Sequence, residues 1–349
     1  MPRLVFANSV DYAPHTGGWV YNTRVVRELA AFGWDVVPLD LPAGFPRPDA
    51  AAIVRSSELF AKVPDGAIVI ADQICLSPLA AVVEPMAQRL RLVMIFHHPI
   101  AKESGLAEAD RARFADLERR ALAACRLVVA TSPSTSGALV ADYGVDRGRI
   151  VVAPPGIERH PSAIPPLEAD APRLLSVGAV IPRKGYHLLV EALAGLRERS
   201  WRLDIVGDLE RAPGYVVELH GLIEVAGLEA RVVLRGGLEH IELDESWRRA
   251  HVYVGASLHE GYGMAVAEAI ARGLPTITTR AGAIGDWLDP AAAIIVSDDS
   301  VYALRSAIAR VLDEPALRKR LRQAALRQAS RFASWADAAR TVGERLVQL

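Results

Sequence analysis

The feature that most constrains the fold is a regular alternation of short apolar segments with longer stretches of helical periodicity. Segments such as 92–96 and 127–130 are rich in Val, Ile and Leu, and each is followed by a longer stretch with apolar residues at helical spacing. This alternation is typical of βαβ units, in which helices cover both faces of a parallel sheet. The chain is therefore predicted to be an α/β protein built on doubly wound parallel sheets.

The apolar segments form two series, separated by a stretch rich in proline. A chain of 349 residues exceeds the roughly 250 to 300 at which a single core stops growing, so two domains are expected. We predict an N-terminal domain at 1–160, a semi-rigid linker at 161–172, a C-terminal domain at 173–330 and a final helical segment at 331–349. The predicted strands are 4–7, 36–39, 67–70, 92–96, 127–130 and 150–153 in the first domain, and 174–177, 203–206, 232–234, 251–256, 276–278 and 293–296 in the second.

The composition excludes several classes of protein. The 40 basic and 41 acidic residues are balanced, and neither half of the chain has the basic excess of a nucleic-acid-binding surface. Hydrophobic residues make up 51% of the chain, yet no run approaches the ~18 consecutive apolar residues of a membrane span. Two cysteines, Cys75 and Cys125, and an N-terminus without a signal-peptide pattern predict a reducing cytoplasm. The G-x-G-x-x-G turn of a nicotinamide dehydrogenase is absent from both halves.

Two glutamates carry the functional argument. Glu260 and Glu268 have seven residues between them, across a glycine-flanked turn that follows the apolar segment 251–256 and precedes a helical pattern. The free N–H groups and the dipole at such a helix N-terminus favour a phosphate. Carboxylates accept hydrogen bonds from vicinal hydroxyls, so two of them beside an anion site fit a sugar attached to that phosphate. The alternative is that Glu260 caps the turn and Glu268 is solvated.

This stretch resembles the Glu-x7-Glu signature of the family 4 glycosyltransferases, which are retaining enzymes of the GT-B fold. The match includes both glutamates, the Gly-aromatic-Gly turn, the Glu-Ala pair and the Gly-x-Pro exit that ends at Pro275. The resemblance implies two Rossmann-like domains that face an interdomain cleft, with the final helix crossing back to the N-terminal domain. It also implies a donor-binding set of Gly17, Gly18, Arg183, Lys184, Arg235, Gly261, Tyr262, Gly263, Met264 and Glu268.

Two cations follow the first strand of the second domain, where they would neutralise a diphosphate. Lys184 and the glycine after it match the phosphate-binding lysine and glycine of the family, and Arg183 precedes them. Ala179 is a departure, because many members carry an arginine at that position. Either Arg183 replaces the missing arginine, or stabilisation of the leaving group is weaker in this chain.

The first domain offers polar residues at the carboxyl ends of its strands. Gly17 and Gly18 precede a helix expected at 20–32, and the resemblance places such a loop over the donor phosphates; an ordinary helix N-terminus is the alternative. His97 and His98 follow the fourth strand, and in similar sequences the first such histidine lies beside the transferred sugar or the acceptor. Adjacent strand residues point to opposite faces, so only one of the two is expected to enter the cleft.

Three residues are predicted to contact the acceptor, namely Asp72, His98 and Ser132, which all lie at strand ends. An N-cap role is the alternative for Ser132. The loop that holds Arg235 is expected beside the nucleobase. Asp298 and Asp299 are interpreted as a turn rather than a metal site, consistent with the metal independence usual in GT-B enzymes.

The resemblance implies transfer of a hexosyl group from a UDP- or GDP-sugar to a hydroxyl of a saccharide, a lipid-linked saccharide or a small molecule. Retention of anomeric configuration and no metal or other cofactor are expected, with Glu260, His97, Lys184 and Arg183 as catalytic residues. The alternatives are a nucleotide-sugar hydrolase or epimerase and a non-catalytic nucleotide-sugar-binding protein. An Arg-bearing helix at 107–122 leaves peripheral membrane contact open, and a monomer and a homodimer are both compatible with the sequence.

Overall fold

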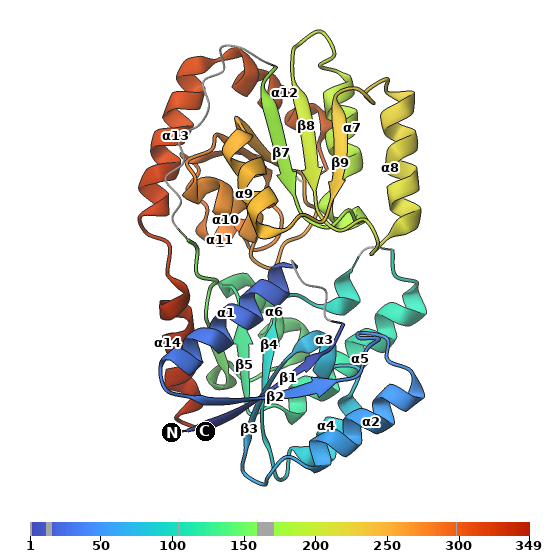
Figure 1. Ribbon diagram of the computed structural model, residues 1–349, viewed down its shortest axis with the longest axis vertical. Helices are drawn as coiled ribbons and strands as arrows, with labels where there is room; N and C mark the ends of the chain where they lie inside the picture. The colour runs from blue at the N-terminus through green and yellow to red at the C-terminus, as the bar shows by residue number, and fades with distance from the viewer. Residues whose placement is uncertain (1, 12–15, 104, 159–170, 298) are drawn as a thin grey trace. The chain divides into compact units, whose positions relative to one another are not determined.

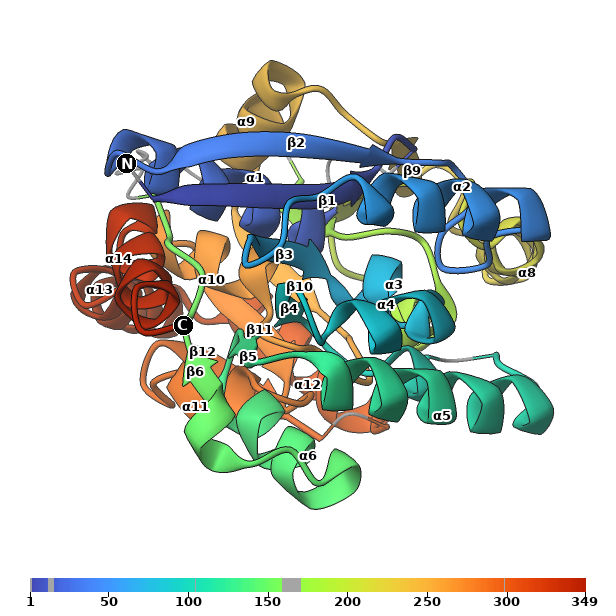
Figure 2. The same cartoon turned by 90° about the horizontal axis from the view of Figure 1, so that it is seen from below.

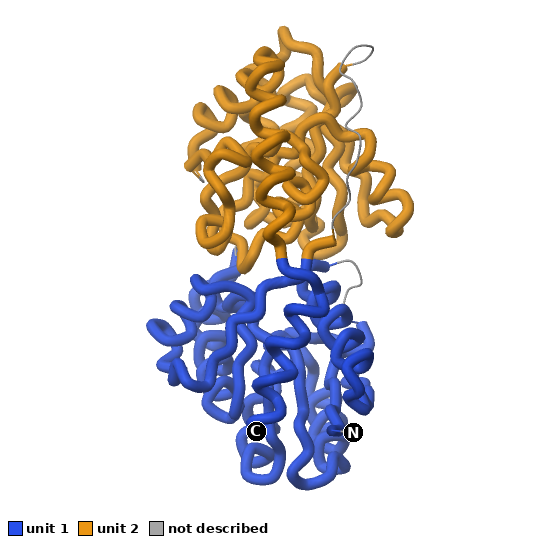
Figure 3. The backbone as a smooth tube through the Cα atoms, turned by 90° about the vertical axis from the view of Figure 1, so that its left-hand side faces the viewer, with its two compact units in different colours: residues 1–156, 333–349 blue, residues 157–332 orange. Residues whose placement is uncertain are grey.

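The computed structural model describes residues 2–11, 16–103, 105–158, 171–297 and 299–349. The chain divides into two compact units (Figure 3), one formed by residues 1–156 and 333–349 and the other by residues 157–332. The first unit is therefore discontinuous in sequence, because the last residues of the chain belong to it. Most of the predicted linker at 161–172 lies outside the described residues.

The first unit is built on a six-stranded parallel sheet in the order β2-β1-β3-β4-β5-β6, and Figure 2 shows β1 between β2 and β3. All residues of β3 and β5 are buried, as expected for strands covered by helices on both faces. The strands are β1 (Arg3–Ser9), β2 (Asp35–Leu41), β3 (Ile68–Asp72), β4 (Arg91–Phe96), β5 (Leu127–Ala130) and β6 (Ile150–Val152). The helices are α1 (Gly17–Ala31), α2 (Ala50–Ala61), α3 (Gln73–Leu76), α4 (Ala80–Met86), α5 (Glu108–Ala124), α6 (Pro133–Tyr143) and α14 (Trp335–Leu346), with short 3-10 turns η1 (Ile100–Lys102) and η2 (Arg147–Arg149).

The second unit repeats this architecture with a parallel sheet in the order β12-β11-β10-β7-β8-β9. Its largest core cluster gathers side chains such as Trp201, Leu219 and Ile308, and α7, α8 and α12 pack on the sheet through this cluster. The strands are β7 (Arg173–Val177), β8 (Arg202–Val206), β9 (Val232–Gly236), β10 (Val252–Gly255), β11 (Thr276–Thr279) and β12 (Ala293–Val296). The helices are α7 (Tyr186–Ala194), α8 (Pro213–Val225), α9 (His240–Arg249), α10 (Met264–Ala271), α11 (Ile284–Trp287), α12 (Val301–Asp313) and α13 (Pro315–Ala329), with a 3-10 turn η3 (Pro182–Lys184).

These sheets confirm the predicted α/β class, and each predicted strand lies within two residues of an observed one. Two local predictions were wrong. The first helix begins at Gly17 rather than at residue 20, because the side chain of Thr16 caps it by accepting a hydrogen bond from the backbone N–H of Trp19. Arg235 lies inside β9 and not in a loop, since β9 continues past a bulge to Gly236.

The C-terminal helical stretch is split between the two units. Helix α13 packs against α10 in the second unit, whereas α14 packs against α1 in the first, and Figure 1 shows α14 and α1 side by side. Trp335 at the start of α14 lies edge-on to Tyr21 of α1, with 6.0 Å between ring centroids. Gly156 allows the chain to pass close by, because a Cβ there would lie 2.1 Å from the backbone nitrogen of Trp335.

Each sheet has one point at which the strand order reverses, and open parallel sheets bind ligands outside the strand carboxyl ends at such points. In the first unit the reversal lies between β1 and β3, and in the second it lies between β7 and β10. The topology therefore directs attention to the segments that follow these four strands.

Candidate active site

The turn that carries Glu260 is fixed by glycines on both sides. Gly263 has φ of +89° and precedes the first residue of α10, in a left-handed conformation that side chains other than glycine rarely adopt. Gly282 lies directly beneath the turn, where a Cβ would be 2.2 Å from the carbonyl oxygen of Glu260. The same carbonyl accepts a hydrogen bond from the N–H of Ala283 at 3.0 Å. The backbone of Glu260 is thus held between β10, α10 and the segment after β11.

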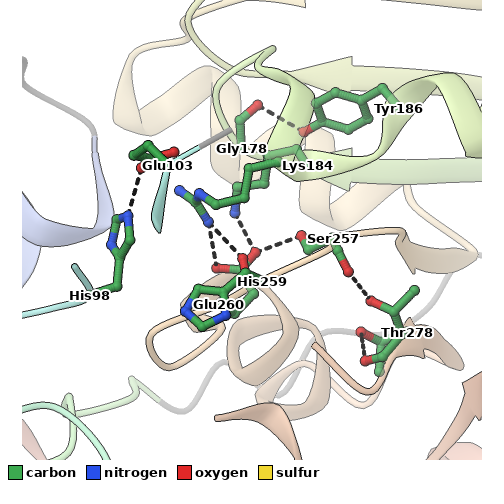
Figure 4. Close-up of polar contacts among 11 residues, drawn as sticks. His98, Glu103, Gly178, Lys184, Tyr186, Ser257, His259, Glu260 and Thr278 are labelled. Carbon is green, nitrogen blue, oxygen red and sulfur yellow. Dashed lines mark hydrogen bonds and ion pairs between the residues drawn. The ribbon is translucent and has the colours of Figure 1, made fainter. Parts of the chain in front are cut away.

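The carboxylate of Glu260 meets two cations and a hydroxyl (Figure 4). Its Oε1 lies 2.6 Å from Lys184 Nζ and accepts a hydrogen bond from Ser257 Oγ at 2.6 Å, while Oε2 lies 3.7 Å from a guanidinium nitrogen of Arg183. The Glu260 side chain is only 12% exposed. Burial by itself would raise the pKa of Glu260, but Lys184 and Arg183 together lower it to about 2. Glu260 is therefore an ionised acceptor of hydrogen bonds at neutral pH.

The cations reach Glu260 because their loop packs against the segment that follows β10. Gly185 has φ of +65°, and a Cβ there would lie 2.0 Å from the carbonyl oxygen of Ala256. The backbone of Arg183 accepts a hydrogen bond from Leu258 N–H at 2.8 Å, and its guanidinium donates one to the carbonyl of His259 at 2.7 Å. Strands β7 and β10 are neighbours at the reversal point, so Lys184 and Glu260, which are 76 positions apart in sequence, meet there.

Gly178 at the end of β7 makes room for Lys184. A Cβ at Gly178 would lie 2.8 Å from Lys184 Cε, so the lysine stem lies across the glycine backbone. The carbonyl of Gly178 accepts a hydrogen bond from the Tyr186 hydroxyl at 2.8 Å (Figure 4). Position 179 holds an alanine, so Lys184 and Arg183 are the cations that form ion pairs with Glu260 in the described part of the second unit.

Glu268 is a second carboxylate of different character. It lies in the middle of α10, half-buried, and among the residues that the structure describes its carboxylate forms no hydrogen bond or ion pair. Burial raises the pKa of Glu268, an effect that the charge of Arg272 opposes. A half-buried carboxylate without such a partner is suited to accept a hydrogen bond from a ligand hydroxyl.

Aromatic packing supports the turn between the two glutamates. Tyr262 stacks on Trp287 with 5.2 Å between ring centroids, and the indole N–H of Trp287 donates to the carbonyl of Tyr262 at 2.8 Å. Met264, the first residue of α10, packs against the same cluster. Gly261 and Gly263, on either side of Tyr262, add no side chains to this turn.

Arg235 is not part of this constellation. Strand β9 is the edge strand beyond β8, and Arg235 Nε forms an exposed ion pair of 2.8 Å with Asp204 Oδ1 on β8. A depression of about 610 Å³ is lined by α13, β12 and the segments beside them, including Arg280, Arg320 and Arg327, and Glu260 is not among its lining residues. Within the described ranges no three His, Cys, Asp or Glu side chains gather as a metal site would require, and no helix there is long and apolar enough to cross a bilayer.

In the first unit, His97 lies at the carboxyl end of β4 beside two buried polar side chains. Its Nε2 is 3.1 Å from Asp72 Oδ2 and 3.1 Å from Asn22 Oδ1. Asp72 ends β3 and is fully buried, so it cannot contact an acceptor hydroxyl directly as the sequence predicted. Burial would raise the pKa of Asp72, but the adjacent His97 and several hydrogen bonds lower it.

The remaining predicted residues of this unit have other partners. His98 Nε2 lies 2.6 Å from Glu103 Oε1, so the two adjacent histidines have different partners. The hydroxyl of Ser132 is buried and caps α6 by accepting from the N–H of Thr135 at 3.0 Å, which is the alternative that the sequence left open. Gly17 and Gly18 are the first residues of α1.

Sequence reasoning missed Ser257 and Asn22. Ser257 follows β10 at the reversal point, so the rule that strand ends carry site residues could have found it. Asn22 lies in the interior of α1, and no local pattern distinguishes it from a solvated helix residue.

The two Rossmann-like units, with ionisable residues at both reversal points, define a protein of the GT-B architecture. Family models agree: residues 161–328 match "Glycosyl transferases group 1" and residues 67–160 match "Glycosyltransferase Family 4". The chain belongs to the family 4 glycosyltransferases.

The chain covers 57% of one curated relative and 75% of another. The D-inositol 3-phosphate glycosyltransferase of Xylanimonas cellulosilytica is 31% identical over 239 residues, which is 64% of this chain and 57% of the relative. The MMP alpha-(1->4)-mannosyltransferase of Mycolicibacterium hassiacum is 28% identical over 318 residues, covering 86% of this chain and 75% of the relative.

Solved structures share the fold across the whole chain. Sucrose-phosphate synthase from Thermosynechococcus elongatus has a TM-score of 0.83 at 21% identity and covers 100% of this chain and 99% of its own. Anabaena HepE in complex with UDP-glucose has a TM-score of 0.81 at 18% identity, covering 100% of both chains. The GT-B fold predicted from the sequence is thereby confirmed.

Proposed function

We propose that this protein transfers a hexosyl group from a nucleotide-diphosphate sugar, with UDP or GDP as the nucleotide, to an acceptor hydroxyl with retention of anomeric configuration. The observation that carries the proposal is the cluster of Lys184, Arg183 and Glu260 at the reversal point of the second sheet. Lys184 and Arg183, whose side chains are 16% and 11% exposed, complement the negative charges of a diphosphate, and Glu260 beside them can accept hydrogen bonds from sugar hydroxyls.

Donor binding would exchange partners within this cluster. Lys184 and Arg183 would bind the diphosphate in place of Glu260, joined by the N–H groups at the start of α10. Glu260, relieved of its cations, would accept hydrogen bonds from hydroxyls of the transferred sugar, and Glu268 from those of the ribose. Gly261, Tyr262, Gly263 and Met264 would border the phosphates with backbone rather than side chains.

The reaction would break the bond between C1 of the sugar and the diphosphate oxygen, and form a bond from C1 to the acceptor oxygen. Negative charge develops on the departing diphosphate, and preorganised cations and helix dipoles stabilise such charge best. The acceptor proton would pass to a donor phosphate oxygen on the same face of the sugar, which retains the configuration. The residues named supply the electrostatics, so no metal or other cofactor is required in this proposal.

The donor is tested by a thermal-shift panel of UDP-, GDP-, TDP- and ADP-sugars, because a ligand that binds the folded state raises its apparent stability. We expect one nucleotide to stabilise the wild type, and Glu268→Ala to weaken its binding about tenfold to hundredfold, as expected for a lost hydrogen bond to a charged group. Glu218→Ala, which removes an exposed carboxylate on α8, is the matched control. No stabilisation of the wild type by any nucleotide sugar would contradict the proposal.

Transfer and its stereochemistry need a second measurement. Proton NMR of the reaction with a stabilising donor and a panel of saccharide acceptors should show a product with the anomeric configuration of the donor, and addition of EDTA should leave the rate unchanged. Release of free sugar without a glycoside would indicate a hydrolase instead. Inversion, or loss of activity with EDTA that returns with a divalent metal, would refute those parts of the proposal.

A further inference from the structure

The imidazole of His97 lies against two polar side chains that are buried away from solvent. Asp72 is fully buried and Asn22 is 1% exposed, so both polar groups are removed from water and need hydrogen-bond partners. Their partners include each other and the ring: Asn22 Nδ2 donates to Asp72 Oδ2 at 2.6 Å, and His97 Nε2 lies 3.1 Å from both side chains.

The donors and acceptors of this cluster determine which nitrogen of the His97 ring carries the hydrogen. An ionised Asp72 accepts only, so the Asn22 nitrogen must face it, and the Asn22 oxygen is then left facing His97. Turning the Asn22 amide over would bring two oxygens within 2.6 Å of one another. Nε2 of His97 therefore faces two acceptors and must carry a hydrogen.

The orientation of the ring is fixed as well. The backbone N–H of His97 donates to Gln73 Oε1 at 2.6 Å, and Gln73 Nε2 donates to the carbonyl of His98. Tyr21 lies edge-on to the imidazole with 5.3 Å between centroids, and its own hydroxyl donates to the carbonyl of Ala153 at 2.8 Å. The position of the ring is thus restrained by the hydrogen bond of the His97 backbone and by the contact with Tyr21.

These contacts leave the other nitrogen of the ring for a ligand. Among the described residues, Nδ1 of His97 has no hydrogen-bond partner, and the side chain is 17% exposed. Asp72 is the last residue of β3, which borders the reversal point of the first sheet, and His97 follows the neighbouring strand β4. This is the edge at which ligands of parallel sheets bind.

We propose that Asp72, together with Asn22, is a positioning residue that keeps the proton of His97 on Nε2, so that Nδ1 is the nitrogen that accepts a hydrogen bond from a sugar hydroxyl of a substrate. The substrate part of this inference rests on the proposed glycosyltransferase function. The tautomer does not, because it follows from the buried contacts alone. Asp72 is thereby moved from the predicted acceptor contacts to a role exerted through His97.

Imidazole nitrogen NMR on the full chain labelled with ¹⁵N-histidine tests the tautomer without any substrate. For the neutral form of the ring, we expect His97 to show a hydrogen on Nε2 and a bare Nδ1. The His97→Gln variant assigns the signal. A ring protonated on Nδ1 in the wild type would overturn the proposal, whatever the protein is found to catalyse.

The Asp72→Asn variant tests whether Asp72 sets this state. We expect a mixture of the two tautomers, because the asparagine amide can present either a donor or an acceptor to Nε2. A roughly tenfold to hundredfold loss of kcat with an unchanged donor KM should accompany it, since a reacting group that is slightly misplaced has effects of that size. Asp65→Asn, at a carboxylate that is 81% exposed in the same unit, should change neither signal nor rate.

An unchanged tautomer in folded Asp72→Asn would refute the positioning role. If that variant does not fold, Asn22→Ala supplies a second test: Asp72 still faces Nε2 there, so the wild-type tautomer should persist, and a ring protonated on Nδ1 would refute the positioning role of Asp72. A wild type that shows the expected tautomer but binds no nucleotide sugar would refute the proposed function and leave the positioning inference standing.

Discussion

At the scale of single residues, the second unit holds two opposite charges as a nearly buried ion pair. Lys184 and Glu260 lie 2.6 Å apart, with side chains 16% and 12% exposed. Opposite charges that lie this close neutralise one another. A buried pair of this kind contributes little net stability, yet removing one partner leaves the other charge uncompensated.

We therefore expect Lys184→Ala to lower the free energy of unfolding by about 3 kcal/mol near neutral pH. In the wild type, the pKa of Glu260 is about 2, below its ordinary value of 4.5, so its contribution to stability is present above pH 4.5 and is lost as the pH falls toward 2. In the variant Lys184 no longer lowers the pKa of Glu260, so the gap from its ordinary value narrows and the loss of stability on acidification should be smaller than in the wild type.

Urea unfolding between pH 3 and 8 measures both effects. Lys102→Ala, which breaks the exposed ion pair with Asp142, is the control and should change little. An equal effect of the two variants would show that the Lys184 pair has no special role in the folded state.

Glu118 supplies the opposite sign of pH dependence. It is buried, accepts hydrogen bonds from the N–H of Ile100 and the hydroxyl of Tyr143, and burial raises its pKa. A raised pKa means that its stabilising contribution is full below the ordinary value of 4.5 and declines as the pH rises through the folded-state value.

Glu118→Gln should remove this decline, so the variant gains stability relative to the wild type as the pH rises. Glu108→Gln, at an exposed position of the same helix, should leave the pH profile unchanged. The measurement is the free energy of unfolding by denaturant as the pH is raised from below 4.5. Curves of equal slope for the wild type and Glu118→Gln would contradict the expectation.

At the scale of elements, the site depends on turns that only glycine can form. Gly185 joins η3 to α7 with φ of +65° and has no room for a Cβ, whereas Gly144 ends α6 with φ of +67° and has nothing within 4 Å. The two positions have the same backbone conformation, but only Gly144 has room for a Cβ. Comparing them therefore separates the cost of backbone strain from the cost of a steric clash.

We expect Gly144→Ala to cost about 1 kcal/mol of stability, the usual penalty for a left-handed residue with a Cβ. Gly185→Ala should cost clearly more, because its Cβ would meet the carbonyl of Ala256 at 2.0 Å and displace the loop that carries Lys184. Stabilisation by the nucleotide sugar should be lost in Gly185→Ala alone. Equal stabilities of the two variants would mean that the loop relaxes without loss.

At the scale of the whole molecule, the chain returns to its first unit at the end. Helix α14 buries Trp335, Ala339, Val342 and Leu346 within that unit, although these residues follow the second unit in sequence. The first unit is therefore incomplete until the chain has been made to its last helix.

Trp335→Ala should destabilise the first unit by about 3 to 5 kcal/mol, the usual cost of truncating a buried aromatic side chain. Hydrogen exchange should show faster exchange in β1 to β6 and unchanged exchange in β7 to β12, because the lost contacts lie in one unit. Glu344→Ala, at an exposed position of α14, is the control. Equal acceleration in both sheets would show instead that the two units unfold together.

Much of the fold was predictable because its signals are local. Buried parallel strands require runs of β-branched residues, and the turn before α10 requires glycine at positive φ, as at Gly263. The bulge that draws Arg235 into β9 depends on pairing with β8, which no run of residues records. The capping of α1 by Thr16 is a local signal that was available in the sequence and was not used.

The two α/β series, the glycine turns and the places of Glu260, Lys184 and His97 after strands could be predicted from the sequence, as could the place of Glu268 within a helix. Which of these residues meet depends on the packing of the strands. Strand β10 lies beside β7, which brings Glu260 to Lys184, and β4 lies beside β3, which sets His97 over a buried Asp72. The periodicity of a segment shows which of its side chains face the core. Contacts between distant segments depend on the order of the strands in the sheet, and this order is set only when the segments pack together.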